Sequence, residues 1–263
     1  MKERGTRNEA TGTPNDVSPA RETSPVTHLR LETVPAAAAK WLFAVSIALL
    51  LCNLLVHLSH YVLGRANLRG FAPMFDLNGE ANVPALFSTL LLVSATILLA
   101  LITSVKRRTR APLSRHWRAL VVIFAYLAID EAAQVHEKVA LNVADLIGTG
   151  GYPVFYAWVL PFAVFVVLVG LAYRPFLRAL APRFRRIFLL AGGIYVGSSL
   201  GLEVVDARYT SVYGFDNLSH HLLYSLEEVG EMWGVILFIY GLLAYLREER
   251  VLVEAHFTRP RAT

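Results

Sequence analysis

Residues 127–137 place three acids at the end of an apolar run and read Leu127-Ala128-Ile129-Asp130-Glu131-Ala132-Ala133-Gln134-Val135-His136-Glu137. The chain is apolar from Ala119 onward, so it is already within a hydrophobic helix when it reaches the acids. A carboxylate inside a membrane helix is costly, and such residues face a bundle interior or a wet cavity. On a continuous helix Asp130, Gln134 and Glu137 share one face, because they are spaced i, i+4, i+7.

The composition of the whole chain indicates an all-α integral membrane protein. Of its 263 residues, 55% are hydrophobic and only 17% are charged, and the mean hydropathy is +0.48. This balance is too apolar for an ordinary soluble domain. The net charge of +5 comes from basic residues in short connections, which favours a role in topology over nucleic-acid binding. The single cysteine, Cys52, excludes a disulfide framework within the chain and a CxxC motif.

Six apolar runs approach the roughly 20 residues that a transmembrane helix needs. They cover residues 41–63, 84–104, 118–138, 154–174, 187–206 and 226–246. The prediction is a bundle of about six transmembrane helices, with four or five as the alternative. We expect residues 1–38 to form a disordered cytoplasmic tail, residues 39–248 the transmembrane domain and residues 249–263 a short cytoplasmic tail.

Basic residues assign the orientation of this bundle. The connection after the second run carries six basic residues and no acid, and the connection after the fourth carries five and no acid. By the positive-inside rule both connections are cytoplasmic, and both chain termini are then cytoplasmic as well. The acidic and His-rich helix ends consequently fall on the outer side.

Four of the predicted helices carry ionisable residues at a similar depth. With a rise of 1.5 Å per residue, Asp130 lies roughly 18 Å and Glu203 roughly 25 Å from the inner basic boundary of its helix. Glu231 and His57 each lie about 25 Å from theirs. In a hydrocarbon core of about 30 Å these groups occupy one outer layer. On the fifth run, Tyr195, Ser199, Glu203 and Asp206 are expected to share one helix face.

A layer of carboxylates and imidazoles is typical of sites for zinc, manganese or iron. We expect such a divalent or transition metal here, with ligands drawn from Asp130, Glu131, His136, Glu203, Asp206, Glu231, His57 and His60. Glu137 or Glu228 is then the candidate catalytic base, acting on a metal-bound water.

The sequence leaves three functions open. The first is a metal-dependent membrane hydrolase or oxidase that acts on a lipid or another apolar substrate. The second is a cation or proton transporter, because intramembrane acids and His line such paths. The third is a non-catalytic subunit or sensor whose polar residues pin helix packing or bind a partner.

Two local patterns add smaller predictions. Gly193, Gly197 and Gly201 form a small-xxx-small ladder, which favours close helix packing within the chain or in a homo-oligomer. Residues 75–82 contain oxygen side chains at alternate positions but lack the full calcium-loop pattern. A turn in which Asn82 caps the second span is therefore favoured.

Overall fold

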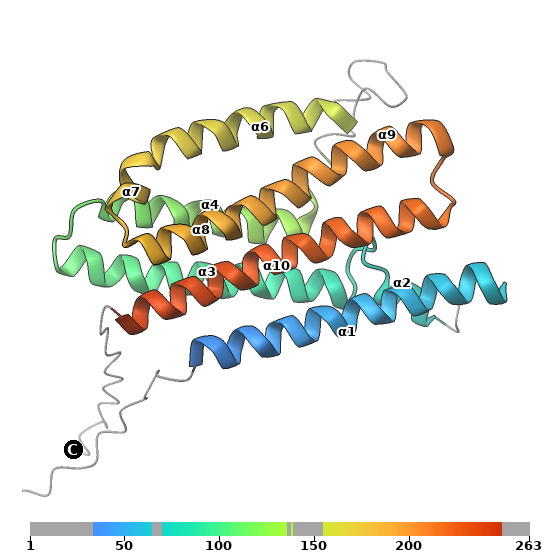
Figure 1. The fold of residues 1–263 in the computed structure, drawn as a ribbon, viewed down its shortest axis with the longest axis horizontal. Helices are drawn as coiled ribbons and strands as arrows, with labels where there is room; N and C mark the ends of the chain where they lie inside the picture. The colour runs from blue at the N-terminus through green and yellow to red at the C-terminus, as the bar shows by residue number, and fades with distance from the viewer. Residues whose placement is uncertain (1–33, 65–69, 136–137, 139–154, 249–263) are drawn as a thin grey trace, which may run out of the picture. The chain divides into compact units, whose positions relative to one another are not determined.

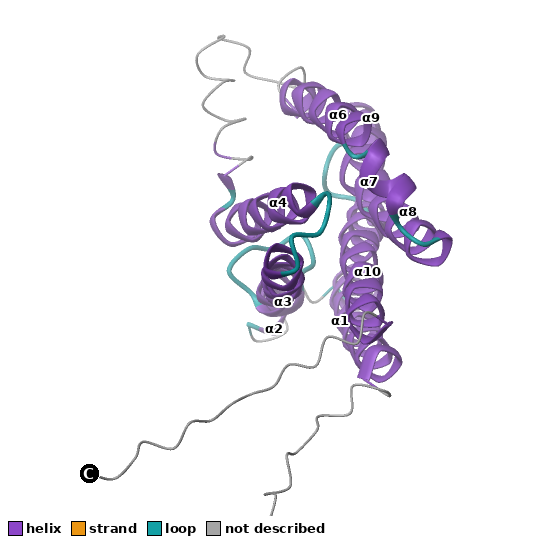
Figure 2. Cartoon of the chain, turned by 90° about the vertical axis from the view of Figure 1, so that its left-hand side faces the viewer, coloured by secondary structure: helices purple, strands orange, loops and turns teal. Residues whose placement is uncertain are grey.

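The structure, a computed structural model, describes residues 34–64, 70–135, 138 and 155–248, and these contain helices and no strands (Figures 1 and 2). They belong to one compact unit, Arg30–Val251. Each of the six predicted apolar ranges overlaps a helix. The elements are α1 (Val34–Leu63), α2 (Phe71–Phe75), α3 (Val83–Arg108), α4 (Ser114–Ala133), α6 (Phe155–Ala172), α7 (Arg174–Ala179), α8 (Pro182–Val196), the π-helical turn η2 (Gly197–Leu202), α9 (Glu203–Tyr213) and α10 (Leu218–Glu248).

Four segments are long and apolar enough to cross a membrane: Val34–Val62, Val83–Arg108, Pro182–Tyr213 and Leu218–Glu248. The third of these is a continuous helical segment made of α8, η2 and α9. Their outward faces carry large apolar side chains, for example Leu55, which is 62% exposed, and Leu190, which is 58% exposed. Exposed apolar surface of this extent is expected where lipid covers the protein.

Helix α10 is the centre of the bundle. It packs against α1, α3, α8, η2 and α9, and Figure 1 shows it between α1 and α8. Its C-terminal half buries a continuous set of apolar side chains, namely Met232, Val235, Ile236, Ile239 and Leu242. Helices α3 and α4 form a second close pair (Figure 2). Aromatic contacts hold α4 against α10, since Phe124 stacks on Phe238 with ring centroids 4.6 Å apart.

Two asparagines fix where α3 and α10 begin. The Asn82 side-chain oxygen accepts from the Ala85 N–H at 3.1 Å, which confirms the predicted cap. Asn217 caps α10 in the same way, accepting from the His220 N–H at 3.0 Å. Each bond satisfies one of the N–H groups that a helix start leaves without an intrahelical partner.

The end of α4 differs from the prediction. The helix stops at Ala133, and Gln134 adopts a left-handed conformation with φ 55°. A left-handed residue breaks the i, i+4 periodicity. The expectation that Asp130, Gln134 and Glu137 share one helix face is therefore wrong for Gln134, and Glu137 lies outside the described residues.

Helices α8 and α10 approach each other closely through glycines of α10. A Cβ atom added to Gly234 would lie 2.8 Å from the backbone nitrogen of Tyr195. One added to Gly230 would overlap the Ser198 side chain. Only residues without a side chain allow helix backbones to come this near.

The π-helical turn η2 changes which residues of the α8–α9 segment face α10. Its wider turn inserts an extra residue into the helical repeat. Ser198 is buried at 8% exposure against α10, and the next residues of this face, Glu203 and Asp206, follow at spacings of five and three. The predicted regular stripe that included Ser199 is therefore corrected, because the stripe passes through Ser198.

Candidate functional site

Glutamate side chains from α9 and α10 lie close together beside α8. Glu227 interacts electrostatically with Glu203 at the start of α9 and with Glu228 and Glu231 on its own helix. Glu227 and Glu231 are one turn apart and so share a face of α10. Carboxylates crowded in surroundings of low dielectric cannot all stay ionised without a compensating proton or cation. We refer to these four residues, together with Glu131 of α4, as the glutamate group.

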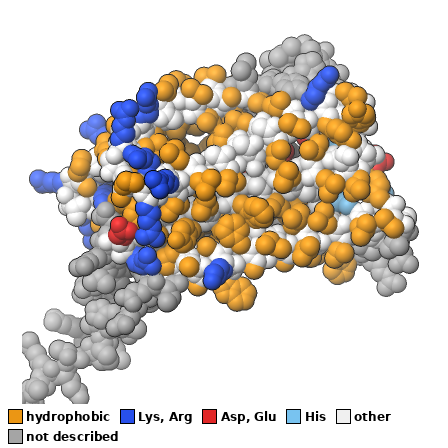
Figure 3. Space-filling model, viewed as in Figure 1, with side chains coloured by type: hydrophobic (Ala, Val, Ile, Leu, Met, Phe, Trp, Pro, Cys, Tyr) orange, Lys and Arg blue, Asp and Glu red, His pale blue; other side chains and the backbone are white. Residues whose placement is uncertain are grey.

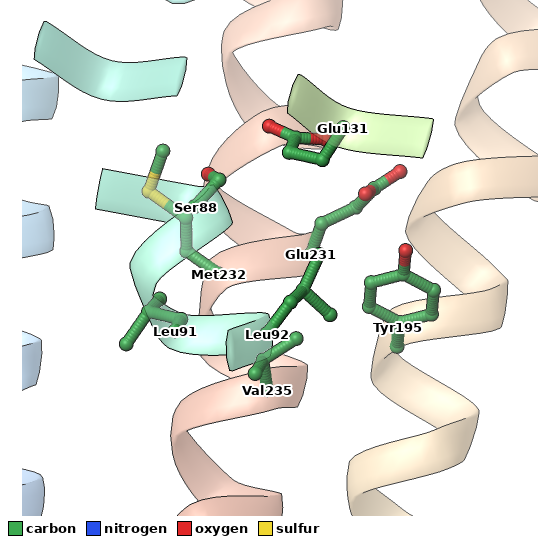
Figure 4. Close-up of a pocket in the computed structure, with 8 residues that line it drawn as sticks. All are labelled: Ser88, Leu91, Leu92, Glu131, Tyr195, Glu231, Met232 and Val235. Carbon is green, nitrogen blue, oxygen red and sulfur yellow. The ribbon is translucent and has the colours of Figure 1, made fainter. Parts of the chain in front are cut away.

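Glu131 and Glu231 line a small cavity between α3, α4, α8 and α10 (Figure 4). In this view the Glu231 side chain extends between Glu131 and the Tyr195 ring, while apolar residues form the opposite wall. The other lining residues are Ser88, Leu91, Leu92, Met232 and Val235. The cavity volume is about 10 Å³, which is close to the space that one water molecule needs.

A second polar network surrounds the hydroxyl group of Tyr224, one helical turn nearer the start of α10. This hydroxyl lies 2.7 Å from His57 Nε2, 2.8 Å from His221 Nδ1 and 3.0 Å from Asp76 Oδ1. The imidazole rings of His57 and His221 stack with centroids 4.1 Å apart. One hydroxyl group thus joins α1, α10 and the connection between α2 and α3.

Asn53, which is fully buried, determines which of these groups donate. The Leu77 N–H can only donate, and it lies 3.1 Å from Asn53 Oδ1. The Asn53 amide nitrogen donates to Ser225 Oγ at 2.7 Å. His57 Nε2 lies 3.1 Å from the same Asn53 oxygen, so this ring nitrogen carries the hydrogen and donates.

Asp76 accepts the hydrogen of Tyr224 at the edge of this network. Burial raises the pKa of Asp76, but the His57 imidazole 3.8 Å away and the hydrogen bonds from Tyr224 and the Asn78 N–H outweigh this effect and hold the pKa below its ordinary value. The Asp76 backbone oxygen also accepts from Asn82 Nδ2 at 2.7 Å. These bonds hold the connection before α3 in the predicted turn.

A histidine–aspartate contact lies between the Tyr224 network and the glutamate group. His220 Nδ1 is 2.9 Å from Asp206 Oδ1, and the two side chains are only 10% and 13% exposed. The His220 ring meets the Tyr224 ring edge to face at 5.2 Å. Asp206 in turn interacts electrostatically with both Tyr224 and Glu227.

The structure separates the predicted metal ligands into different surroundings. No group of three or more His, Cys, Asp or Glu side chains in the described part of the chain is arranged to hold a metal ion. Glu131, Glu203 and Glu231 belong to the glutamate group, together with the predicted catalytic base Glu228. Asp130 is buried on α4, and Asp206 pairs with His220.

The two predicted histidine ligands within the described residues do not join the glutamates. His57 belongs to the Tyr224 network, and His60 contacts the ring of Tyr61 at 4.8 Å. His136 and the second candidate base, Glu137, lie outside the described residues.

The sequence interpretation missed two features of this region. It left open whether Glu227 or Glu228 shares a face with Glu231 and named a solvated helix end as an alternative for Glu227, although the i, i+4 spacing of Glu227 to Glu231 is a signal for a shared face. It also assigned no role to the pairing of Asp76 with Tyr224. The 147 intervening residues give no periodic signal for such a contact.

One family model matches residues 41–246 of the chain, and its description is "Domain of unknown function (DUF8692)". The chain belongs to this family. No curated protein and no solved structure matches. The matched range includes α2, α3, α4, α6, α7, α8, α9 and most of α1 and α10, and thus all the residues of the glutamate group and the Tyr224 network.

Proposed function

We propose that this chain is a multi-pass membrane protein of the transporter class, which binds protons in the glutamate group and exchanges them with the outer side of the membrane. The observation that carries the proposal is the small cavity that Glu131 and Glu231 line together beside Tyr195. Glu227 lies one helical turn before Glu231 on α10 and interacts electrostatically with Glu203, Glu228 and Glu231. Crowded carboxylates share protons, as paired carboxylates do in acid–base enzymes. The cavity beside Glu131 and Glu231 has room for about one water molecule, with which these carboxyl groups can exchange protons.

The proposed topology has six spans, with both termini cytoplasmic. Helices α4 and α6 supply the third and fourth spans, in addition to the four segments of sufficient length and apolarity. Basic side chains support this orientation: Figure 3 shows most Lys and Arg of the visible face gathered at one end, beside a hydrophobic flank. The start of α10, with His220, lies at the opposite end of that helix from Arg247. In the proposed orientation the Tyr224 network is therefore on the outer side.

Access from one side follows from the residues along α10. Ionisable side chains run from His220 to Glu231, a length of about 16 Å at 1.5 Å per residue. Beyond Glu231 the helix buries the apolar residues Met232 to Leu242. In this conformation a proton therefore reaches the glutamate group from the outer side and meets an apolar barrier toward the cytoplasm.

Protons account for the geometry better than iron, manganese or zinc does. The donors that the described residues bring together are carboxylate oxygens, whereas the expected ligands His57 and His60 lie in other contacts. A cavity of about 10 Å³ is also too small for an acyl chain. The metal-dependent hydrolase or oxidase, with membrane lipid as substrate, stays a prediction from sequence.

Infrared spectroscopy of the protein in liposomes tests the proposal, because protonated and ionised carboxyl groups absorb differently. We expect a carboxylic-acid C=O band at pH 7, where exposed Asp and Glu are ionised. Glu227→Gln and Glu231→Gln should each reduce this band. Glu248→Gln is the matched control, because Glu248 lies at the far end of α10, is 53% exposed and contacts Arg183. Its band should equal that of the wild type.

Two results would overturn the proposal. The first is a wild-type protein without a carboxylic-acid band at pH 7. The second is a stoichiometric metal found by elemental analysis that Glu203→Gln and Glu231→Gln both remove, which would restore the metal-site prediction.

A further inference from the structure

We propose that His220 is the proton shuttle between outer water and the glutamate group, with Asp206 as the first internal acceptor. This inference rests on the proposed function, since it names the route by which the same protons enter. It concerns a residue that is buried and hydrogen-bonded, at the first turn of the central helix.

The position of His220 is fixed at both its backbone and its ring. Asn217 accepts from its backbone N–H, and Asp206 Oδ1 lies 2.9 Å from its Nδ1. The Asp206 backbone oxygen accepts from Thr210 Oγ at 2.8 Å, within α9. The imidazole therefore spans the boundary between the exposed connection before α10 and the acidic face of α9.

Ionisable groups lie on two sides of the His220 ring, and each side is a possible direction for proton transfer. Toward α1, the Tyr224 hydroxyl is already engaged by His57, His221 and Asp76, so it does not lead to Asp206. Toward α9, Asp206 interacts with Glu227, which lies about two turns further along α10 than His220. Above the ring, Phe215 makes an edge-to-face contact at 5.5 Å, and the neighbouring Asp216 accepts from the Tyr61 hydroxyl.

The two nitrogens of one imidazole permit transfer without movement of the backbone. A proton from water binds at Nε2, where a new N–H bond forms. The N–H bond at Nδ1 then breaks, and its proton forms an O–H bond on Asp206. Asp206 then gives this proton up toward Glu227, the carboxyl group with which it interacts electrostatically. The ring regains its first tautomer when Nε2 releases its proton to outer water and Nδ1, after rotation of the side chain away from Asp206, takes another proton from water. In total, one proton has then passed from water to Asp206. No oxidant or other co-reactant is required.

His220→Asn separates this role from a structural one. The asparagine amide nitrogen occupies a place similar to Nδ1, so it can still donate to Asp206, but it does not titrate. We expect the carboxylic-acid band to remain, and its shift on exchange from H₂O to D₂O to become about a hundredfold slower. This magnitude follows because a positioned acid–base group contributes roughly 10²–10⁴-fold to proton-transfer steps.

The matched control is His60→Asn, which changes a half-buried histidine at the outer end of α1 and should leave the exchange rate unchanged. A second variant, His220→Gly, should regain fast exchange when imidazole is added. If the wild type has no carboxylic-acid band, the proposed function fails. If the band is present and His220→Asn exchanges as fast as the wild type, only the shuttle is refuted. If His220→Asn is slow but imidazole does not rescue His220→Gly, the shuttle is refuted as well.

Discussion

The close packing of α8 on α10 can be tested at single glycines. A Cβ atom at Gly234 would lie 2.8 Å from the Tyr195 nitrogen and 2.9 Å from its Cα. These are backbone atoms, so no side-chain rotation relieves the contact. A Cβ atom at Gly193 meets nothing within 4 Å. Gly234→Ala and Gly193→Ala thus add the same methyl group to the two partners of one helix pair.

The expected difference follows from two contributions. Replacing Gly by Ala inside a helix stabilises the protein by roughly 0.8–1 kcal/mol in both variants. Overpacking costs about 1–3 kcal/mol and applies to Gly234→Ala alone. The two variants should therefore differ by about 1–3 kcal/mol in free energy of unfolding. For a chain of this size that corresponds to a Tm difference of about 2–12 °C, with Gly234→Ala the lower.

Thermal unfolding of the detergent-solubilised variants, followed by circular dichroism, measures this difference. Gly234→Ala should also reduce the carboxylic-acid band, since displacing Tyr195 opens the wall beside Glu231. Equal Tm values would refute the reasoning about helix approach. A larger loss in Gly193→Ala would refute it too, and would indicate that another copy of the chain covers Gly193, Gly197 and Gly201, as in the homo-oligomer predicted from the sequence.

Further variants test the polar connections at the outer end. The native contacts of Asp76 lower the pKa of its carboxyl group. The contribution of Asp76 to stability is therefore complete above the unfolded-state pKa of about 3.9 and is lost as the pH falls through the lower folded-state pKa. In a pH series, the Tm of Asp76→Asn should decrease less in acid than the Tm of the wild type. Asn53→Ala leaves three hydrogen-bond partners without their bonds. It should lower the free energy of unfolding by several kcal/mol, at about 1–3 kcal/mol for each buried group. The control Leu55→Ala, on the exposed face of α1, should lower it less in the same denaturation assay. Asn82→Ala should destabilise the protein by about 1 kcal/mol through loss of the α3 cap. Chemical denaturation measures this value, with Asn78→Ala as the control variant.

The apolar runs made the helices predictable, because their length and composition leave few alternatives for backbone hydrogen bonding in a membrane. The Asn82 cap was predictable for a similar reason, since it depends on residues a few positions apart. The face of α4 was not, because a single left-handed residue, Gln134, ends the periodic order on which the prediction relied.

Composition and pattern alone determined that this chain is helical, how its apolar segments divide, and that acids and histidines occur within several of them. The tertiary structure decided which of these residues meet. The approach of Gly234 to Tyr195 and the π-helical turn before Glu203 set the distance and rotation of α9 against α10. Both depend on packing between segments far apart in the chain, so periodicity within one helix cannot report them. For that reason His57 joins Tyr224 and Asp76, while Glu203 joins Glu227.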